Sequence, residues 1–413
     1  MVERLYSSPK AIGRIRSGPL RAFVDSYAEG LLHQGYTEST LRPKVRLLGA
    51  LSQWMHVRQI PITTLDEGLV ARFLAHVVTK RHIADGDRAA LRQLLQHLHQ
   101  RGVIPPSSPE GHQSNAVPAI EQEYFRYLAQ ERGLSPLAIR QQISLVRRFL
   151  SASFGACAID LATLSPEHVR QFTMALAQRL KRRSTQTALS TLRGFLRFLY
   201  IRGDTSTNLA GSVLKIACWR LASLPKFISA EKVESILSCV DRSTPMGLRD
   251  YAILLLLARL GLRAGEVATL ELRDINWAAG EFTVRGKSAR QDRLPILHDV
   301  GEALVRYLRH GRPRCACRRV FLRTQAPIEG FRDCGSVTRI VHGYVLRAGL
   351  NPSRKGAHLL RHSLATRMLR EGSSLAEIGE VLRHQNVSTT EVYAKVDLLA
   401  LRSLAQPWPG DNA

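Results

Sequence analysis

A stripe of apolar residues with helical spacing occurs twice in this chain, about one hundred residues apart, and this repeat constrains the fold more than any other feature. The residues of each stripe recur at i, i+4, i+7 and i+10, the pattern of one buried helix face. A Gly-x-Thr or Gly-x-Ser triplet precedes each stripe, at Gly35 and Gly133. Both segments are therefore expected to be helical. The stripes are Leu41, Val45, Leu48 and Leu51 in the first copy and Ile139, Ile143, Val146 and Phe149 in the second.

The correspondence continues along both segments, and the offset between matching residues grows only from 98 to 101. Each copy is predicted as four short helices that stop at Gly102 or Gly203, because glycine readily takes the left-handed conformation of a helix C-terminus. Two unrelated helical bundles could also be aligned this way, but the shared turn residues favour a duplication. The further matches pair Leu65, Val70, Phe73, Leu91, Leu95 and Leu98 with Leu164, Val169, Phe172, Leu192, Leu196 and Leu199.

The net charge points to a polyanionic partner. Lysine and arginine number 59 against 34 acidic residues, which gives +25, while 45% hydrophobic residues indicate an ordinary globular chain. Such a field attracts phosphate backbones. An anionic membrane is the rival, but the chain shows no long basic amphipathic tail and no lipidation motif. Its start has no signal-like apolar core and its apolar run 252–258 is too short to span a bilayer. We expect a soluble intracellular protein without a membrane partner.

Six cysteines in so long a chain do not form a disulfide framework, so reduced thiols are expected. Cys315 and Cys317, with Cys334 and His342 downstream, could ligate zinc, but C-x-C spacing is poor for a tetrahedral site. The acidic residues near 66 and 85 show no spacing typical of a magnesium site. We expect no metal and no other cofactor.

A Pro/Ser-rich stretch at 104–118 separates the two helical segments and is interpreted as a linker. From about residue 225 the texture changes to a mixed α+β pattern. The predicted parts are 1–103, a linker 104–119, 120–205, a linker 206–224, 225–399, and a tail 400–413. In the third part, helices are predicted over 229–240, 248–260, 264–270, 300–309, 337–348, 358–371, 375–382 and 389–404, and antiparallel strands over 274–277, 281–285 and 293–296.

Polar residues in this third part stand where helix and turn formation does not require them. The ordered set is Arg263 after a very apolar helix, Lys287 after a strand, H-x-x-R-H at His358, Arg361 and His362, then His384 and Tyr393. Singly, each has a plain interpretation. Arg263 could pair with Glu266 on its helix, and a tyrosine on an amphipathic helix is usually half-buried core. His358 and His362 have metalloprotease spacing, but the glutamate of H-E-x-x-H is missing.

Taken together and in this order, these residues resemble the tyrosine site-specific recombinases, or phage-integrase family, over about 225–399. Residues 120–205 resemble the helical, SAM-like core-binding domain of that family. The resemblance implies a mainly α fold in which helical N-terminal domains precede an α+β catalytic domain with a small antiparallel sheet. The first helical segment is a departure, since many members carry nothing there or a small arm-binding domain. The implied roles are phosphate-clamping Arg263 and Arg361, general acid Lys287, the two histidines His358 and His384, nucleophile Tyr393, and supporting Glu266 and His362.

The chemistry explains these residue types. Attack on a phosphodiester builds negative charge on the non-bridging oxygens, which guanidinium groups neutralise without a metal. A tyrosine hydroxyl must lose its proton to attack, so positive neighbours help. The leaving 5′-oxygen must gain a proton, which the resemblance assigns to Lys287. A covalent 3′-phosphotyrosine then allows rejoining without ATP.

We therefore expect an integrase or transposase-like recombinase that cuts and rejoins specific double-stranded DNA sites. The implied assembly is a tetrameric synapse on DNA, in which partner recombinases could take part. We expect it in the bacterial cytoplasm and, when bound to DNA, at the nucleoid. A type IB topoisomerase uses similar chemistry. The alternative from another class is a DNA-binding regulator with this fold and no catalysis.

The segment 111–225 has a net charge of +9 and is the source of the expected DNA contacts. Its basic run at a predicted helix start could also be an ordinary solvated helix end. The first copy keeps Arg42, Lys44 and Arg46, and is expected to contact flanking DNA or a protein of the synapse. The helix predicted over 389–404 is expected to dock on a neighbouring protomer; the alternative is that it packs on its own domain. The DNA-binding candidates are Arg140, Arg147, Arg179, Lys181, Arg182 and Arg183.

Overall fold

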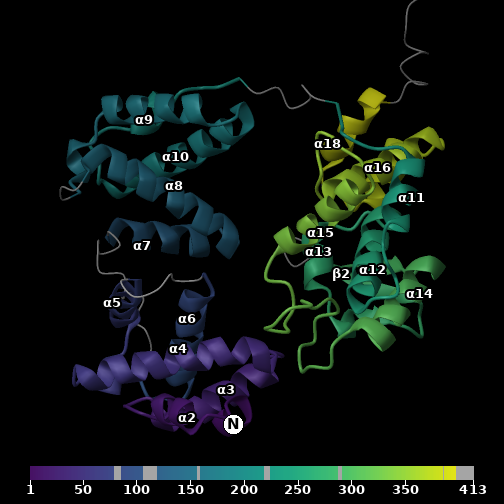
Figure 1. The fold of residues 1–413 in the computed structure, drawn as a ribbon. Coiled ribbons are helices and arrows are strands. Elements are labelled where there is room, and N and C mark those ends of the chain that lie inside the picture. The colour runs from purple at the N-terminus through teal and green to yellow at the C-terminus, as the bar shows by residue number, and fades with distance from the viewer. Residues whose placement is uncertain are drawn as a thin grey trace, which may run out of the picture. The chain divides into compact units, whose positions relative to one another are not determined.

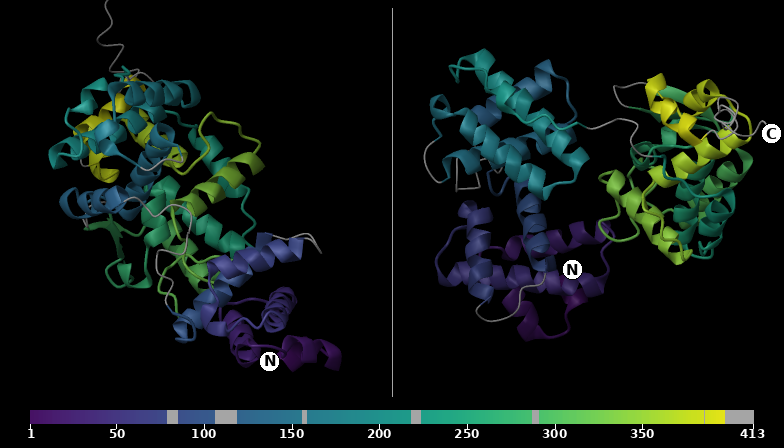
Figure 2. Two further views of the ribbon diagram at one scale, coloured as in Figure 1. Left: turned by 90° about the vertical axis from the view of Figure 1, so that its left-hand side faces the viewer. Right: turned by 90° about the horizontal axis from the view of Figure 1, so that it is seen from above.

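Helices dominate the computed structural model from every direction of view (Figures 1 and 2). The structure describes residues 1–78, 85–105, 119–155, 159–217, 224–286, 291–384 and 386–396. Contacts between Cα atoms divide the chain into two units. One comprises residues 1–62, 84–97 and 223–413, and the other residues 63–83 and 98–222. The parts are described one at a time.

The first hundred residues form the predicted helices and bury the predicted stripe. Leu41, Val45, Leu48 and Leu51 are each at most 1% exposed. The Tyr27 hydroxyl donates to the carbonyl of Ala90 over 2.9 Å and links two helices. The helices are α1 (Val2–Leu5), α2 (Pro9–Ile15), α3 (Val24–His33), α4 (Glu38–Val57), α5 (Glu67–Val78) and α6 (Asp85–Gln100).

One basic residue expected on the surface of this region is used internally. Lys44 Nζ donates to Gln93 Oε1 over 2.9 Å and lies 4.9 Å from the centre of the Tyr36 ring. Burial lowers the pKa of this ammonium. The Lys44 side chain thus joins α4 to α6. Contact of the first segment with flanking DNA or with a protein of the synapse stays a prediction.

Residues 119–217 repeat the order of elements seen in the first region. A glycine with positive φ, Gly35 or Gly133, precedes the longest stripe-bearing helix, and Gly102 or Gly203, also at positive φ, ends the last one. The duplication remains a prediction, which this shared order supports. The elements are α7 (Ala119–Arg126), a π-helical turn (Tyr127–Glu131), α8 (Pro136–Phe154), α9 (Pro166–Arg179) and α10 (Arg182–Arg202).

Local chemistry explains these boundaries. Ser135 caps α8 by accepting from the Ala138 N–H, and Pro136 supplies a first residue that needs no N–H partner. The core does not end at residue 205. Leu209, Ala210 and Val213 are buried in it, so the beginning of the predicted linker 206–224 packs on the helices.

The region from residue 224 forms the α+β part around α12, whose residues Ile253 to Leu257 are at most 1% exposed. Thr244 caps this helix at the Gly247 N–H. The sheet is antiparallel in the order β1-β2-β3, and Val284 pairs with Asp292. The elements are α11 (Ala230–Ser238), α12 (Pro245–Arg259), α13 (Ala264–Thr269), β1 (Ile275–Asn276), β2 (Glu281–Arg285), β3 (Gln291–Pro295), α14 (His298–Arg306), α15 (Cys334–Arg347), α16 (His358–Arg370), α17 (Leu375–Val381) and α18 (Val387–Thr390).

The predicted elements of this part are confirmed within a few residues at their ends, with one exception. The helix expected over 389–404 is instead α18, which ends at Thr390, followed by a 3₁₀ segment Glu391–Val396. The β-branched side chains of Thr389, Thr390 and Val392 lose rotamer freedom in an α-helix and weaken it here. Residues 397–413, with the proposed docking surface, lie outside the described residues.

Candidate active site

Arg263 lies where the chain turns from α12 into α13. Gly261, at φ +59°, ends the apolar helix, and Arg263 becomes the N-cap of the next one. Its backbone N–H donates to Glu266 Oε2 over 2.8 Å, and its Nη1 donates to Glu266 Oε1 over 2.7 Å. The pairing with Glu266 thus exists. In addition, Nη2 donates to the carbonyl of Arg383 over 3.1 Å, which ties this guanidinium to a loop 120 residues away.

Arg361 is held by carbonyl groups inside the protein. It lies on α16, is 4% exposed, and donates to the carbonyls of Gly261 and Leu382. Burial lowers its pKa to about 10, and the charges of Arg263 and Arg383 act in the same direction. Among the described residues, no ion pair between Arg361 and a carboxylate is present. This charge is desolvated, oriented and still positive at neutral pH.

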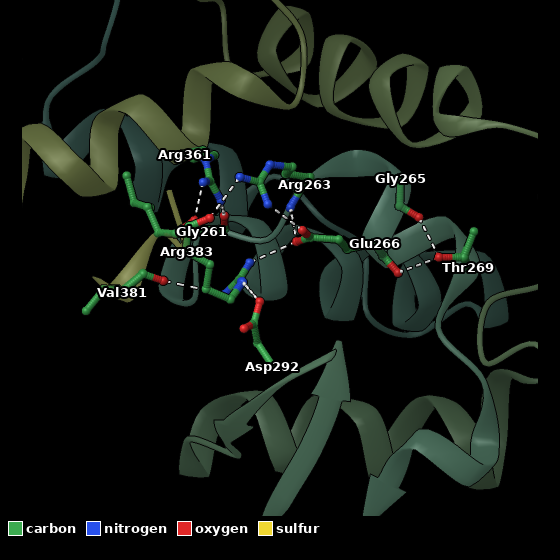
Figure 3. Close-up of polar contacts among 10 residues, drawn as sticks. Gly261, Arg263, Gly265, Glu266, Thr269, Asp292, Arg361, Val381 and Arg383 are labelled. Carbon is green, nitrogen blue, oxygen red and sulfur yellow. Dashed lines mark hydrogen bonds and ion pairs between the residues drawn. The ribbon is translucent and has the colours of Figure 1, made fainter. Parts of the chain in front are cut away.

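A third arginine, which the sequence analysis did not single out, completes this cluster (Figure 3). Arg383 Nη2 donates to Glu266 Oε2 over 2.8 Å, and the two side chains are 5% and 4% exposed. Arg383 Nε lies 4.0 Å from Asp292 Oδ2 on β3. Arg383 lies between Leu382 and His384, in a polar turn at the end of a helix. This position is the sequence feature that could have identified it as a site residue.

The hydroxyl of Tyr393 is hydrogen bonded to His362, 2.8 Å from its Nδ1. Tyr393 is 1% exposed, and burial raises its pKa to about 12, against the effect of the Arg361 charge. Burial, followed by the charges of His358, Arg354 and Arg361, lowers the pKa of His362 to about 4. Both groups are therefore uncharged at neutral pH, so the phenol can donate and the imidazole can accept.

The remaining histidines line the same cluster. His384 Nδ1 lies 2.8 Å from Thr390 Oγ1, and burial, reinforced by Arg361 and Arg263, lowers its pKa to about 4. The ring of His358 lies 6.3 Å from that of His362, and burial lowers its pKa too. The structure thus gathers the predicted residues from α13, α16 and the segment after α17. Lys287 lies outside the described residues.

Known proteins match this chain along its length. The model of the phage integrase family matches residues 226–398, and that of the SAM-like N-terminal domain of phage integrases matches 122–203. A protein of Sinorhizobium fredii named as an integrase/recombinase, y4rA, is 43% identical over 97% of both chains. The chain belongs to the phage integrase family. Tyrosine recombinase XerC of Serratia marcescens is 33% identical over 70% of this chain and 94% of its own.

The fold agrees with solved structures of such recombinases. The XerH site-specific recombinase bound to palindromic difH substrate, in a post-cleavage complex, has a TM-score of 0.52 at 18% identity, covering 70% of this chain and 84% of XerH. The predicted fold class is confirmed, and the family assignment makes the protein an integrase or tyrosine recombinase.

The basic run of this recombinase surrounds the start of α10. Arg179 ends α9, Lys181 is the N-cap of α10, and Arg182 and Arg183 are its first residues. All four are exposed, and the first turn of α10 contains no acidic residue. These four cations repel one another, and the helix N-terminus adds its own partial positive charge. An anion bound here would reduce this repulsion.

The other two DNA-binding candidates of the recombinase differ. Arg140 is exposed on α8. Arg147 donates to both carboxylate oxygens of the buried Glu121, the shorter bond being 2.7 Å. Phosphate contact by Arg147 would compete with this ion pair, so Arg147 is the weaker candidate.

The zinc alternative has no geometry to support it in the described residues. Cys315, Cys317 and Cys334 are free thiols, and no group of three metal-ligating side chains lies among the residues searched. Within the same residues, no helix is long and apolar enough to cross a membrane. Cys157 and Cys218 lie outside the described residues.

Proposed function

We propose that this recombinase cleaves and rejoins double-stranded DNA at specific sites through a 3′-phosphotyrosine bond to Tyr393. One observation carries the proposal. The guanidinium groups of Arg263 and Arg361 come from different helices, yet they donate to the carbonyls of two consecutive residues, Arg383 and Leu382. The next residue is His384, and Tyr393 is buried in the same hydrophobic cluster as Leu382.

The two arginines suit a phosphodiester that gains charge during attack. Arg361 is almost fully buried, whereas the side chain of Arg263 is 36% exposed and can meet a phosphate from solvent. Rigid donors in a desolvated site stabilise developing negative charge better than flexible donors in water do. The clamp therefore favours the transition state over the resting phosphate.

The proton transfers can be assigned to specific groups. The hydroxyl of Tyr393 loses its proton as its oxygen attacks phosphorus, and neutral His362 is positioned to accept it. The P–O5′ bond breaks and the leaving oxygen takes a proton, a role we assign to Lys287. Rejoining reverses these steps when a 5′-hydroxyl attacks the phosphotyrosine, so no ATP is consumed. His358 and His384 add donors beside the phosphate.

The assembly follows from strand exchange, which needs two DNA sites and four cleavages. We propose a tetrameric synapse, formed by copies of this recombinase alone or together with partner recombinases, that serves a mobile element. Its place would be the bacterial cytoplasm, on the nucleoid while bound to DNA. Basic residues of 120–205 would contact phosphates, Arg182 and Arg183 most directly and Arg147 only in competition with Glu121.

A nicked suicide substrate tests the function. The wild-type protein should form a covalent adduct resistant to denaturation, whereas Tyr393→Phe should bind the same DNA and form none, because only the hydroxyl is lost. EDTA should leave adduct formation unchanged. Tight binding by the wild type without any adduct would instead identify a catalytically silent regulator, and an adduct formed by Tyr393→Phe would exclude Tyr393 as the nucleophile.

A further inference from the structure

Arg383 is an unusual residue for the place it occupies. Its φ is +54°, and among the described non-glycine residues only Gln59 shares a positive φ. Glycine adopts this conformation without the steric conflict that a side chain introduces. A turn alone would therefore be better served by glycine. The arginine side chain must contribute something that compensates for the backbone conformation.

Its contacts join three elements of the site. The guanidinium donates to Glu266 on α13 over 2.8 Å and approaches Asp292 on β3 at 4.0 Å. The backbone carbonyl of the same residue accepts from Arg263 Nη2 over 3.1 Å. The preceding carbonyl, that of Leu382, accepts from Arg361. One residue thus connects the acidic support, the sheet and the backbone that holds both phosphate-clamping arginines (Figure 3).

The electrostatics of Glu266 point the same way. Its carboxylate is 4% exposed and is shared by Arg263 Nη1 and Arg383 Nη2. A buried carboxylate needs its partners, because an unpaired charge inside a protein is strongly disfavoured. With the Arg383 side chain removed, Glu266 would bind Arg263 alone, and the loop from Leu382 to His384 would lose its ion pair to α13 and keep only the backbone hydrogen bond from Arg263.

We propose that Arg383 is a positioning residue that fixes the loop carrying His384 to Glu266 and thereby sets the orientation of Arg263 and Arg361 for cleavage. The inference rests on the proposed function. Arg383 does not touch the reacting phosphate in this account and acts only through the groups it holds. DNA binding, which depends on the wider basic surface, should be almost independent of it.

The test compares Arg383→Gly, Arg383→Gln and Arg383→Lys in the full-length protein. If Arg383 positions the clamp through its charge, the single-turnover cleavage rate at saturating suicide substrate should fall at least tenfold in Arg383→Gly and Arg383→Gln. Arg383→Lys should recover part of the loss, and the Kd for DNA should change less than twofold in all three. If the residue serves only the turn, the order reverses and Arg383→Gly cleaves as fast as wild type or faster.

Two controls keep the result interpretable. Gln59→Gly makes the same backbone change at the other positive-φ position and should leave the cleavage rate unchanged. Melting temperatures should be measured for all three variants and should show that each is folded, Arg383→Gly included, because glycine removes a steric conflict at this position. An adduct formed equally by wild type and Arg383→Gly would overturn the positioning role while leaving the recombinase mechanism intact. Absence of an adduct in the wild type itself would instead overturn the proposed function.

Discussion

At the scale of single residues, the site concentrates positive charge around one carboxylate. Arg263 and Arg383 both pair with Glu266. Arg361 instead donates to the carbonyls of Gly261 and Leu382 and has no acidic partner among the described residues. Carbonyl groups orient a guanidinium without cancelling its charge. In the proposed mechanism, the charge of Arg361 would therefore remain available to the phosphate.

Replacement of either clamping arginine should be costly for chemistry. Loss of one fixed donor to a developing charge typically costs ~3 kcal/mol, so Arg263→Ala and Arg361→Ala should each slow single-turnover cleavage about a hundredfold or more. Arg370→Ala, an exposed change at the end of the helix that carries Arg361, is the matched control and should retain the wild-type rate. A loss below tenfold in both site variants would argue against the clamp.

The buried histidines predict how stability varies with pH. His362 and His384 have pKa values lowered to about 4 in the folded protein, whereas unfolded histidine titrates near ~6.5. Between these values the unfolded chain binds more protons, so acid favours unfolding. The melting temperature should fall as the pH drops from about 6.5 towards 4. His362→Gln should reduce this fall, and the exposed control His342→Gln should not; equal pH dependence in all three proteins would contradict the assignment.

The sequence named residues that the structure brings together, but it did not predict their contacts. Arg263, Arg361, His384 and Tyr393 could be named because their order and spacing are distinctive. The bond from Arg383 to Glu266 spans 117 residues and that from His362 to Tyr393 spans 31. Such contacts depend on how helices pack, and no local period encodes them. Lys287 stays a prediction from the sequence alone.

At the scale of elements, apolar periodicity was sufficient to place most helices and all three strands. The prediction from apolar periodicity failed near Tyr393. The apolar spacing there suits an α-helix, but the segment with the β-branched residues and the buried tyrosine forms a tighter 3₁₀ turn. Capping residues refined the ends, as at Ser135 and Thr244. The start of α10 gathers exposed basic side chains, and its first turn contains no acidic residue to balance them.

The basic start of α10 should account for part of the salt dependence of DNA binding. Each lost phosphate contact lowers the magnitude of the slope of log affinity against log salt by ~0.9. Arg182→Ala and Arg183→Ala should each show about this change. Arg170→Ala is the control, since Arg170 is equally exposed but pairs with Glu167 over 2.7 Å. Unchanged slopes in both α10 variants would mean that the run is merely a solvated helix end.

At the scale of the whole molecule, the two helical segments share an order of elements but differ in the size of their positive net charge. Residues 1–110 carry a net +6 and residues 111–225 a net +9, and in the first segment Lys44 is engaged internally. The smaller number of cations suggests a secondary position on flanking DNA. We favour this over a purely protein-binding role because Arg42 and Arg46 are exposed on the helix that corresponds to α8.

Removal of the first segment tests this position. A chain starting at Val117 should protect a shorter stretch of DNA than the full-length protein and show a shallower salt dependence, by ~0.9 for each lost contact. Cleavage of a minimal site should persist. Identical footprints and slopes would mean that the first segment does not touch DNA, and the protein-contact interpretation would then replace ours.

The burial of Tyr393 and its hydrogen bond to His362 have a consequence for the cell that makes this protein. A nucleophile whose hydroxyl is covered by its own domain cannot meet passing phosphodiesters at random. If Tyr393 is the nucleophile, the protein would bind DNA without nicking it wherever this hydroxyl stays covered, and cleavage would be confined to sites where bound DNA exposes the hydroxyl. The selectivity of cleavage would then depend first on the burial of this tyrosine and only afterwards on the recognition of bases.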